Sequence, residues 1–283
     1  MLFLTEARVR ELLPMAKAIE LVESGFRHQA AGQARNQPRR RLQLGSSATL
    51  HSMEAVDLTV GFLGAKVYST HPQTGAHFLV LLYASDGRPL AVIQANALGQ
   101  IRTGAATGVA TRLLARQQAV VGLIGAGFQA RTQLEAVALV RRLREVRVYS
   151  RTEAGRSRFA AEMSPVAGVE ITPVDSPEKA IRGCDIAITA TTAREPVLLG
   201  EWLDEGVHIN AVGSNHSRRR ELDAARRWRA RRWWLWTRSS EVTVFKSNGL
   251  ALEDPAVAGY VIRRPPGLVS SEIGEGDTLV RLT

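Results

Sequence analysis

The sequence predicts a two-domain α/β protein. Its length of 283 residues suits two domains of ordinary size. From Val120 onward, short β-branched runs alternate with helical stretches, a pattern typical of parallel strands joined by crossover helices. In the first hundred residues several strands follow one another, which indicates an α+β domain. The two parts of the chain are therefore expected to have different architectures.

The first hundred residues are expected to begin with a helix and continue as strands. Apolar residues at helical spacing predict a helix over about 15–31. Strands are expected at four places: 41–44, 59–69, 78–84 and 90–94. The Ser85-Asp86-Gly87 turn predicts that the last two strands form a hairpin. Asn96 is expected to cap a helix over about 98–116.

The middle of the chain predicts a parallel sheet. Its expected strands are 120–124, 146–150, 169–173, 186–190 and 207–211. We place the domain boundary near Gln117-Gln118, so that the domains cover 1–117 and 118–240. A strand over 242–245 and a helix over about 250–262 follow, and this last segment is too short to be a domain of its own.

Composition excludes several classes of protein. Hydrophobic residues make up 45% of the chain and charged residues 23%, which is globular and not disordered. No run of 18 apolar residues exists, so no transmembrane helix is expected. The single cysteine, Cys184, has no internal disulfide partner, and residues 1–6 lack the pattern of a signal peptide. We therefore expect a reduced, cytoplasmic compartment.

The net charge of +10 has a local origin. Residues 216–238 contain nine arginines and two acids, which is +7, so the rest of the chain carries 10 − 7 = +3. A charge concentrated in this way does not indicate a nucleic-acid-binding protein as a whole.

A glycine-rich segment follows the first strand of the predicted parallel sheet. It reads Gly125-Ala126-Gly127-Phe128-Gln129-Ala130, a G-x-G-x-x-A pattern between a strand and a helix. Gly125 permits a tight turn, Gly127 lets the backbone approach a pyrophosphate, and Ala130 keeps the helix close to the strand. The helix N-terminus adds free N–H groups and a partial positive charge. The pattern predicts a Rossmann-type domain that binds a dinucleotide; the alternative is a glycine-rich turn in a nonbinding α/β domain.

The end of the second strand bears on which dinucleotide is bound. NAD enzymes usually place an acid there, to bind the ribose hydroxyls. This chain has Ser150-Arg151-Thr152, and Arg151 would favour a 2′-phosphate through charge-assisted hydrogen bonds. We therefore expect NADP(H) to be preferred over NAD(H). The alternative is that Arg151 is a solvated surface arginine.

Four separated segments resemble the ornithine cyclodeaminase/mu-crystallin family. They are Gly64-Ala65-Lys66-Val67-Tyr68, Gly99–Thr107, His208–Asn215 and Thr243–Gly249. The resemblance covers most of residues 5–223 and resumes at about 241–254. It implies a Rossmann domain plus an α+β substrate and dimerisation domain built from both chain ends, 1–117 completed by about 241–283. It also implies a homodimeric, NAD(P)-dependent enzyme that transfers hydride on a small α-amino or cyclic imino acid.

The resemblance assigns the substrate carboxylate to three cations. They are Arg40 (in Gln-Pro-x-Arg), Lys66 and Arg102, which would hold the carboxylate and polarise the imine. Lys66 lies in an apolar strand, where an unpaired buried charge would be costly. Without the resemblance, Lys66 would be interpreted as an edge-strand lysine that faces water, and Arg102 as an arginine on the surface of a helix. Arg39 and Arg41 compete with Arg40 for the alignment. We expect Lys66 and Arg102 to converge on one cleft.

The same resemblance extends the cofactor site. Thr103 lies among small residues that resemble the family's contacts to the cofactor phosphates, although tight helix packing would explain them equally well. Thr191 follows a strand at the ligand-binding edge of the sheet, on the nicotinamide side. Gly249, in the last of the four segments, is also assigned to the cofactor.

The first departure from the family is Asn215. Cyclodeaminases have an aspartate at this position after Val-Gly-x. An amide cannot exchange a proton near neutral pH, so Asn215 is expected to orient the substrate nitrogen and not to act as acid or base. This puts cyclodeamination of ornithine in doubt. Three possibilities remain: an oxidoreductase, a cyclodeaminase, and a ligand-binding protein without turnover.

Two other features bear on the chemistry. His216, next to Asn215, is either an alternative proton donor or a surface histidine. No His/Cys/Asp spacing indicates a metal site.

The second departure is a short connection of 19 residues between Asp223 and Thr243. Its run over 226–236 is rich in arginine and tryptophan. Residues 233–237 would suit a final strand of the parallel sheet, and the run would also suit a nucleic-acid or membrane surface. We favour a shortened or disrupted gene product, in which folding or dimerisation is impaired. Neither nucleic acid nor membrane is therefore expected as a partner.

Overall fold

The computed structural model describes residues 1–214, 219–224, 241–246 and 248–263. The chain divides into two compact units, one formed by Met1–Arg102 with the chain from Gly249, and the other by Thr103–Asn248. The division falls within helix α3 (Asn96–Leu114). It therefore differs from the boundaries near 117 and 241 expected from the sequence. Each unit is described separately below.

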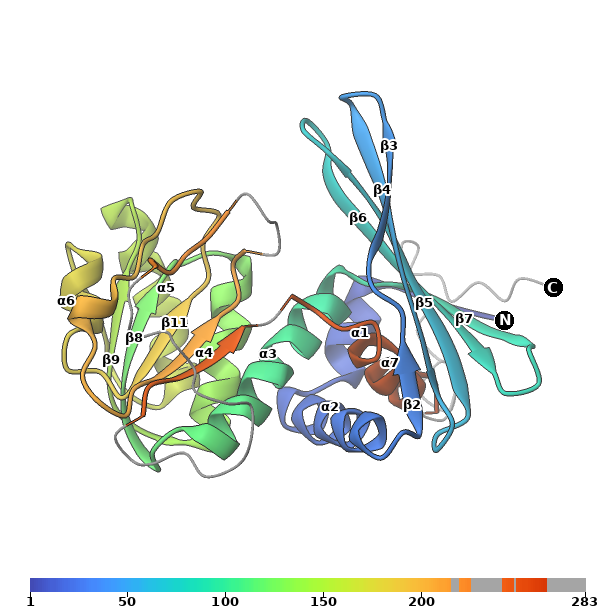
Figure 1. Ribbon diagram of the computed structural model, residues 1–283, viewed down its shortest axis with the longest axis horizontal. Helices are drawn as coiled ribbons and strands as arrows, with labels where there is room; N and C mark the ends of the chain where they lie inside the picture. Colours follow the sequence, from blue (N-terminus) through green and yellow to red (C-terminus); the bar gives the residue numbers. More distant parts are fainter. Residues whose placement is uncertain (215–218, 225–240, 247, 264–283) are drawn as a thin grey trace, which may run out of the picture. The chain divides into compact units, whose positions relative to one another are not determined.

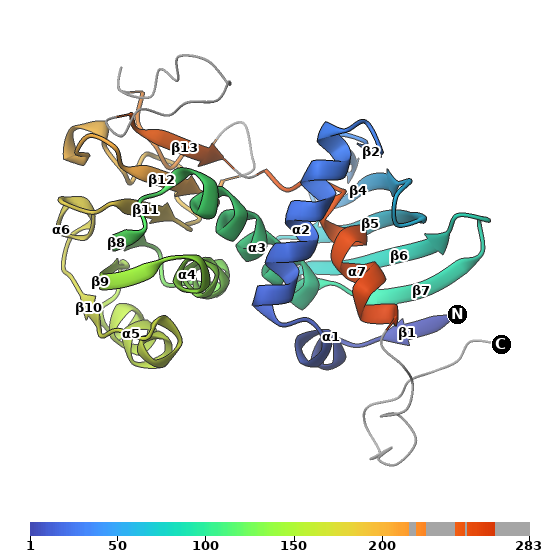
Figure 2. The ribbon, with the colours of Figure 1, turned by 90° about the horizontal axis from the view of Figure 1, so that it is seen from below.

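The first unit is a mixed seven-stranded sheet with helices on one face (Figures 1 and 2). The strand order is β1-β7-β6-β5-β4-β2, with β3 paired to β4, and only the β1–β7 pair is parallel. The strands are β1 (Leu2–Leu4), β2 (Ala34–Asn36), β3 (Arg40–Leu44), β4 (Ala48–Asp57), β5 (Phe62–His71), β6 (Gly75–Ala84) and β7 (Pro89–Gln94). The helices are α1 (Glu6–Leu12), α2 (Met15–Ala30) and α7 (Glu253–Arg263). A mostly antiparallel sheet with helices on one face confirms the expected α+β architecture, and residues from both ends of the chain build it.

Strand β4 was not predicted from the sequence. Its inward-facing residues are His51, Met53, Ala55 and Asp57, all buried. Since two of these four are polar, the sequence lacks the apolar alternation that marks a half-buried strand. The expected hairpin of β6 and β7 is confirmed, with Gly87 at φ +85° in its turn.

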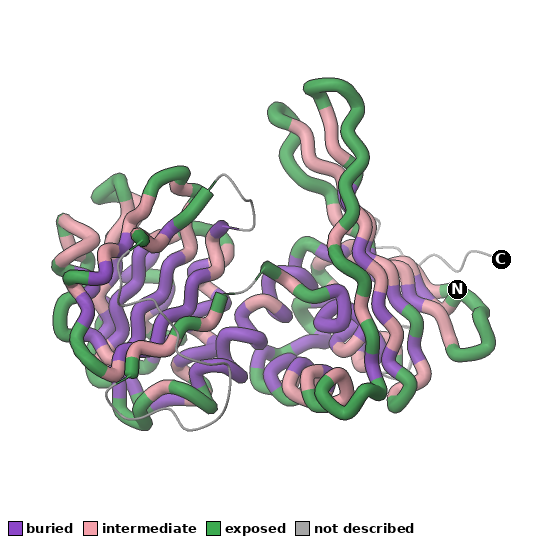
Figure 3. The backbone as a smooth tube through the Cα atoms, viewed as in Figure 1, coloured by how far each residue is buried: buried purple, intermediate pink, exposed green. Residues whose placement is uncertain are grey.

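Part of the first sheet extends beyond the helices. Strand β3 and the adjoining ends of β4, β5 and β6 are mostly exposed or half-buried (Figure 3). The residues that pack against the helices lie nearer the middle of the sheet, where Met53, Tyr68 and Leu252 share one apolar cluster. Within the described chain, the helices therefore do not cover this extension.

The second unit contains a six-stranded parallel sheet of order β10-β9-β8-β11-β12-β13. The strands are β8 (Gln118–Ile124), β9 (Arg142–Tyr149), β10 (Ile171–Pro173), β11 (Ile186–Thr189), β12 (His208–Ala211) and β13 (Thr243–Lys246). The other elements are α4 (Phe128–Val140), α5 (Glu153–Ala167), α6 (Pro177–Ile181) and the short 3-10 helix η1 (Gly200–Trp202). Counted from β8 the order is 3-2-1-4-5-6, which confirms the predicted Rossmann-type domain.

Helices cover both faces of this sheet (Figure 2). On one face, α4 and α5 form an apolar cluster with the strands that includes Leu134 and Phe159. On the other face, α6 contributes Ile181 to a second cluster with Leu198 and Ile209. Because both faces are buried, the central strands are mostly apolar, as the sequence pattern indicated. Thr189, His208 and Asn210 are buried polar exceptions.

The last strand, β13, joins the second unit, whereas α7 joins the first. Strand β13 pairs in parallel with β12, with Thr243 opposite His208. The sequence predicted instead that residues from about 241 onward all belong to the domain formed by the chain ends. The alternative final strand at 233–237 lies outside the described residues. No helix in the described chain has the length and apolar character needed to span a membrane.

Candidate active site

The glycine turn after β8 has the geometry that the sequence motif predicts. Gly125 has φ +111°, in the region that favours glycine, and its amide donates to the Tyr149 carbonyl at 2.8 Å. A Cβ at Gly125 would lie 2.4 Å from the Ala190 carbonyl oxygen. At Gly127 an added Cβ would have nothing within 4 Å, so the backbone there faces open space. The turn is therefore compact on one side and accessible on the other.

A cleft of about 610 Å³ opens at this turn. It is lined by three segments, Ile124–Gly127, Tyr149–Thr152 and Ala190–Arg194, and by Gly155 and Val197. Of the predicted cofactor residues, seven line the cleft: Gly125, Ala126, Gly127, Ser150, Arg151, Thr152 and Thr191. Three others, Phe128, Gln129 and Ala130, form the first turn of α4, where Ala130 is buried against the sheet. The cleft lies at the carboxyl ends of β8, β9 and β11, where ligands bind in sheets of this kind.

The β9 side of the cleft is a turn without a carboxylate. Thr152 caps α5 by accepting from the Gly155 amide at 3.3 Å, and Ser150 Oγ donates to the Thr152 carbonyl at 3.1 Å. Arg151 is exposed beside them. The first acid in the chain after this turn is Glu153, within α5.

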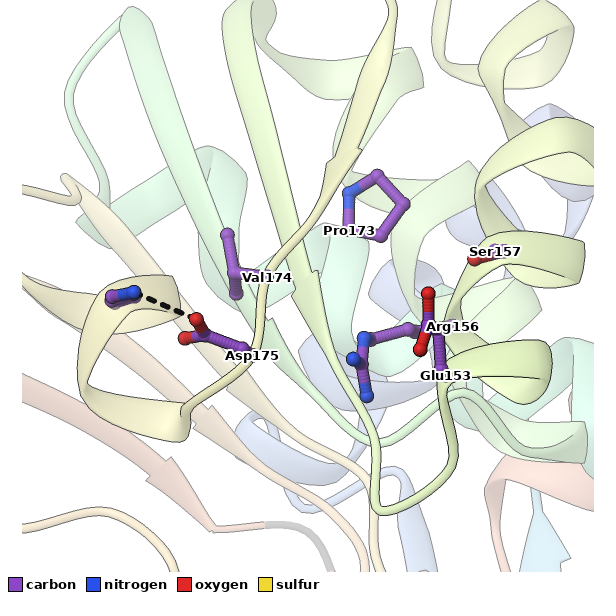
Figure 4. A pocket seen from close by; sticks show the side chains of 7 residues that line it. Glu153, Arg156, Ser157, Pro173, Val174 and Asp175 are labelled. Carbon is purple, nitrogen blue, oxygen red and sulfur yellow. Dashed lines mark hydrogen bonds and ion pairs between the residues drawn. The ribbon is translucent and has the colours of Figure 1, made fainter.

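A smaller cleft of about 290 Å³ lies between α5 and the segment after β10 (Figure 4). Its charged side chains are Glu153, Arg156, Asp175 and Lys179. Lys179 pairs with Asp175 at 2.7 Å, and Arg156 donates to the Ser150 carbonyl at 3.3 Å. Both cations thus stabilise nearby structure, and Arg156 holds the turn at the end of β9.

In the first unit, Lys66 points from β5 toward the helices. Only 4% of the residue is exposed, and its Nζ lies 3.0 Å from Asp254 Oδ1. The ammonium group also lies 5.3 Å from the centre of the Phe78 ring, a cation–π distance. A Cβ at Gly99 would come within 2.8 Å of Lys66 Nζ. The small residue at 99 therefore makes room for the ammonium group.

Arg102, which is 7% exposed, reaches the same carboxylates. Its Nη1 lies 2.5 Å from Glu253 Oε2, and its Nε lies 3.4 Å from Asp254 Oδ1. Lys66 and Arg102 therefore meet at one oxygen of Asp254. The structure brings together two of the three cations that the resemblance assigned to the substrate.

Glu253 and Asp254 were not predicted from the sequence as site residues. They are the acids in the first turn of α7, where acids are common because they suit the helix dipole. The sequence signal was therefore an ordinary one. Their burial, with 3% and 0% exposed, is what distinguishes them. Together with Lys66 and Arg102 they form a buried quartet of two positive and two negative side chains.

Burial and pairing act in opposite directions on the cations of this quartet. Burial lowers the pKa of Lys66, and the nearby Asp254 only partly opposes this. Burial also acts to lower the pKa of Arg102, but Asp254 and Glu253 outweigh it and the pKa is raised. Lys66 is therefore the cation in the quartet that releases a proton more readily than usual.

The third assigned cation, Arg40, does not join the quartet. It is exposed on β3, opposite Ser52 of β4. Arg39 is half-buried instead, and its Nε lies 3.3 Å from Met53 Sδ. Burial lowers the pKa of Arg39, and Arg102 and Asp254 are among the charges that act on it. The structure thus places Arg39 near the quartet, because neighbouring side chains in an extended segment point to opposite sides.

Two further assigned residues have packing roles in the structure. Gly249, at φ +73°, lies against the cations, since an added Cβ would be 3.1 Å from Arg102 Nη1 and 3.5 Å from Arg39 Nη2. Thr103 is half-buried in α3 next to Gly104, where a Cβ would lie 2.4 Å from the Thr132 carbonyl oxygen of α4. This close approach favours the tight-packing explanation for the small residues of α3.

The remaining catalytic assignment, Asn215, lies outside the described residues, as does His216. The chain before them is described to Ser214, which follows β12. Among the described residues, no group of three or more His, Cys, Asp or Glu side chains is arranged to hold a metal ion.

Comparison with known proteins identifies the family. The ornithine cyclodeaminase/mu-crystallin family matches residues 1–234. Alanine dehydrogenase from Archaeoglobus fulgidus is 36% identical over 230 residues, 78% of this chain and 70% of that protein. The structure of Thermococcus litoralis Δ1-pyrroline-2-carboxylate reductase in complex with NADH and L-proline is 32% identical, with a TM-score of 0.86 over 93% of this chain and 96% of that one. An archaeal alanine dehydrogenase dimer with bound NAD is 31% identical, with a TM-score of 0.85 over 93% and 95%. The chain belongs to the ornithine cyclodeaminase/mu-crystallin family.

Proposed function

We propose that the protein catalyses NAD(P)-dependent hydride transfer on the α-carbon of a small α-amino or cyclic imino acid. The observation that carries the proposal is the convergence of Lys66 and Arg102 on Asp254. A chain that buries two cations in this way and also has a dinucleotide cleft contains the two parts that such a reaction needs. The alanine dehydrogenase and the proline-bound reductase described above support the substrate class.

The residues at the cleft suit a nicotinamide dinucleotide. A volume of about 610 Å³ is within the range of small-molecule sites, roughly 300–1,000 Å³. Gly127 leaves open space where a pyrophosphate would approach the backbone at the start of α4. When bound, the cofactor supplies or accepts the hydride. Gly125–Gly127 would hold its phosphates, and Ser150–Thr152 its adenosine end.

The proposed preference is for NADP(H) over NAD(H). The turn at 150–152 offers the exposed cation of Arg151 and no carboxylate. A guanidinium group would bind a 2′-phosphate through two parallel hydrogen bonds, whereas NAD-specific sites use an acid to bind the free hydroxyl.

The buried cations would hold the carboxylate of the substrate. The quartet is neutral as a whole, and Arg39 adds a positive charge beside it. An incoming carboxylate would therefore meet a net attraction from Arg39 and Arg102. Gly249 keeps the space beside both guanidinium groups free of a side chain.

Lys66 would transfer the proton to and from the substrate nitrogen. Reduction of an imine requires a hydride on carbon and a proton on nitrogen, and the reverse reaction removes both. Because the pKa of Lys66 is lowered by burial, its ammonium group is a better proton donor than an ordinary lysine. Asn215 would orient the substrate nitrogen.

The first unit would also form a homodimer. Five leucines on the sheet face away from the helices are exposed: Leu42, Leu44, Leu50, Leu63 and Leu79. An apolar sheet face of this kind is typical of a surface that a partner covers, and the archaeal alanine dehydrogenase structure is a dimer. The unit built from both chain ends would thus combine substrate binding and dimerisation.

We also propose that the protein is located in the cytoplasm.

The test is an assay of the purified protein with NADPH and NADH in parallel. Cyclic ketimine acids, and pyruvate with ammonia, are the substrates to compare. We expect cofactor oxidation with at least one of them, faster with NADPH. Tight cofactor binding without any turnover would instead support a ligand-binding protein. Release of ammonia from ornithine without net cofactor oxidation would support a cyclodeaminase.

A further inference from the structure

We propose that Glu221 is a positioning residue that holds the nicotinamide half of the cofactor site in shape. The inference deepens the proposed function and rests on its cofactor site, but not on turnover. Glu221 lies outside the parallel strands and does not line the cleft. Its carboxylate acts on the segments that follow two of those strands.

The Glu221 carboxylate joins the segments after β11 and β12. The residue is 2% exposed. Its Oε1 accepts hydrogen bonds from the Thr191 amide at 2.8 Å and the Thr191 hydroxyl at 2.9 Å. Its Oε2 accepts from the Gly213 amide at 2.8 Å. Each carboxylate oxygen therefore binds a different segment, and each of these three groups is a donor.

A carboxylate is the only ordinary side chain of this size that satisfies such a site. An ionised carboxylate offers two accepting oxygens, whereas the amide of glutamine has one oxygen and one NH2 group that only donates. Glutamine at this position would turn the NH2 group toward either Thr191 or Gly213. One of the two segments would then face a donor in place of an acceptor, which leaves a buried N–H unpaired.

The two segments pack too closely to adjust. A Cβ at Gly213 would lie 2.3 Å from the Thr191 carbonyl oxygen and 2.4 Å from Glu221 Oε1. The Glu221 carbonyl also accepts from the amides of Val197 and Leu198, at 2.8 and 3.0 Å. Glu221 is thus fixed at its backbone as well as at its carboxylate, and a shift of the carboxylate would move both segments.

Lys246 supports the β12 segment from β13. Its Nζ donates to the Ala211 carbonyl at 3.2 Å and to the Ser214 carbonyl. The segment that leads from β12 toward residue 215 is therefore held at its amide by Glu221 and at its carbonyls by Lys246.

The strand order identifies which part of the cofactor this network serves. A sheet of order 3-2-1-4-5-6 consists of two mononucleotide-binding halves, and the first three strands carry the glycine turn. Strands β11, β12 and β13 form the second half. Thr191 lines the cleft on that side, while the turn at 150–152 lines it on the other. Glu221 therefore acts on the half that would receive the nicotinamide ribose and ring.

The test compares the whole cofactor with one of its fragments. Affinities for NADPH and for adenosine 2′,5′-bisphosphate, which has only the adenosine end, are measured by calorimetry for the full chain and for Glu221→Gln. We expect NADPH binding to weaken roughly 10- to 100-fold, the range for a lost hydrogen bond to a charged group. Binding of the fragment should not change. The control is Glu201→Gln, at an exposed glutamate of η1.

A second variant covers the case in which Glu221→Gln does not fold. Thr191→Val removes the hydroxyl that donates to Glu221 and accepts from the Ala193 amide, and Thr191→Ser retains it. We expect valine, but not serine, to weaken NADPH binding by roughly 3- to 10-fold. Equal losses for NADPH and the fragment, or no loss for NADPH, would overturn the role of Glu221. A wild-type chain that binds neither ligand would overturn the cofactor site and this inference together. NADPH binding without turnover would defeat only the proposed catalysis.

Discussion

Lys66 Nζ and Asp254 Oδ1 lie 3.0 Å apart, although 188 positions separate the two residues in the chain. Both side chains are almost fully buried. The pair links the middle of the first sheet to the start of a helix that forms near the other end of the described chain. The ion pair therefore forms only when the chain folds, and its removal should lower the free energy of unfolding.

Asp254→Asn should destabilise the first unit strongly. Loss of one partner from a buried ion pair leaves the other charge uncompensated, which costs about 3–5 kcal/mol. The free energy of unfolding in urea measures this. Asp86→Asn, which removes an exposed pair with Arg88, is the matched control and should have no measurable effect. A double variant, Lys66→Met with Asp254→Asn, should recover part of the loss, because it removes both charges.

Lys66→Met should slow turnover strongly while leaving the cofactor bound. General acid–base groups contribute about 10²–10⁴-fold to rate, and kcat should fall by that amount. In the wild type, imine reduction needs protonated Lys66, so the rate should decline as pH rises through its pKa. Because burial lowers that pKa, the decline should begin below the range of an ordinary lysine. A variant with unaltered kcat would show that Lys66 is not the proton donor.

Arg39 and Arg40 should differ in their effect on substrate binding. Arg39 lies near the quartet, whereas Arg40 is exposed on β3. Arg39→Ala should raise KM for the amino or imino acid by roughly 10- to 100-fold, as for a lost charge-assisted hydrogen bond. Arg40→Ala should leave KM near the wild-type value. The opposite result would restore the assignment made from the sequence.

Arg151→Ala should change cofactor preference. If Arg151 binds a 2′-phosphate, KM for NADPH should rise by roughly 10- to 100-fold, while KM for NADH stays nearly constant. Steady-state kinetics with each cofactor gives the ratio. Arg158→Ala, at an exposed position further along α5, serves as the control. Equal effects on both cofactors would argue against phosphate recognition at this position.

His208 should make the second unit sensitive to acid. It is fully buried, and burial lowers its pKa to about 4. The unfolded chain binds a proton near the ordinary pKa of 6.5, but the folded chain does not until about 4. Stability is therefore full above pH 6.5 and falls as pH drops, by up to about 3 kcal/mol at pH 4. Urea unfolding of the wild type and of His208→Gln across this range should show a smaller pH dependence in the variant.

Much of the second unit follows from local patterns in the chain. The alternation of strands and helices and the Gly125-Ala126-Gly127 turn predicted the parallel sheet and the edge at which its cleft lies. These features depend on residues that are close in sequence, and a glycine at positive φ is required wherever such a turn occurs. The family motifs likewise indicated Lys66 and Arg102 as a functional pair.

Other features depend on contacts between distant segments. Local pattern gave no sign that Glu253 and Asp254 are buried, because acids in the first turn of a helix are usually exposed. The choice between Arg39 and Arg40 rests on which side of the strand faces the helices, and the membership of β13 rests on its pairing with β12. Motif and periodicity thus determined the type of each domain and its glycine turn. The partners of the buried charges were decided only by tertiary structure, because a buried charge is stable only where folding brings an opposite charge to it.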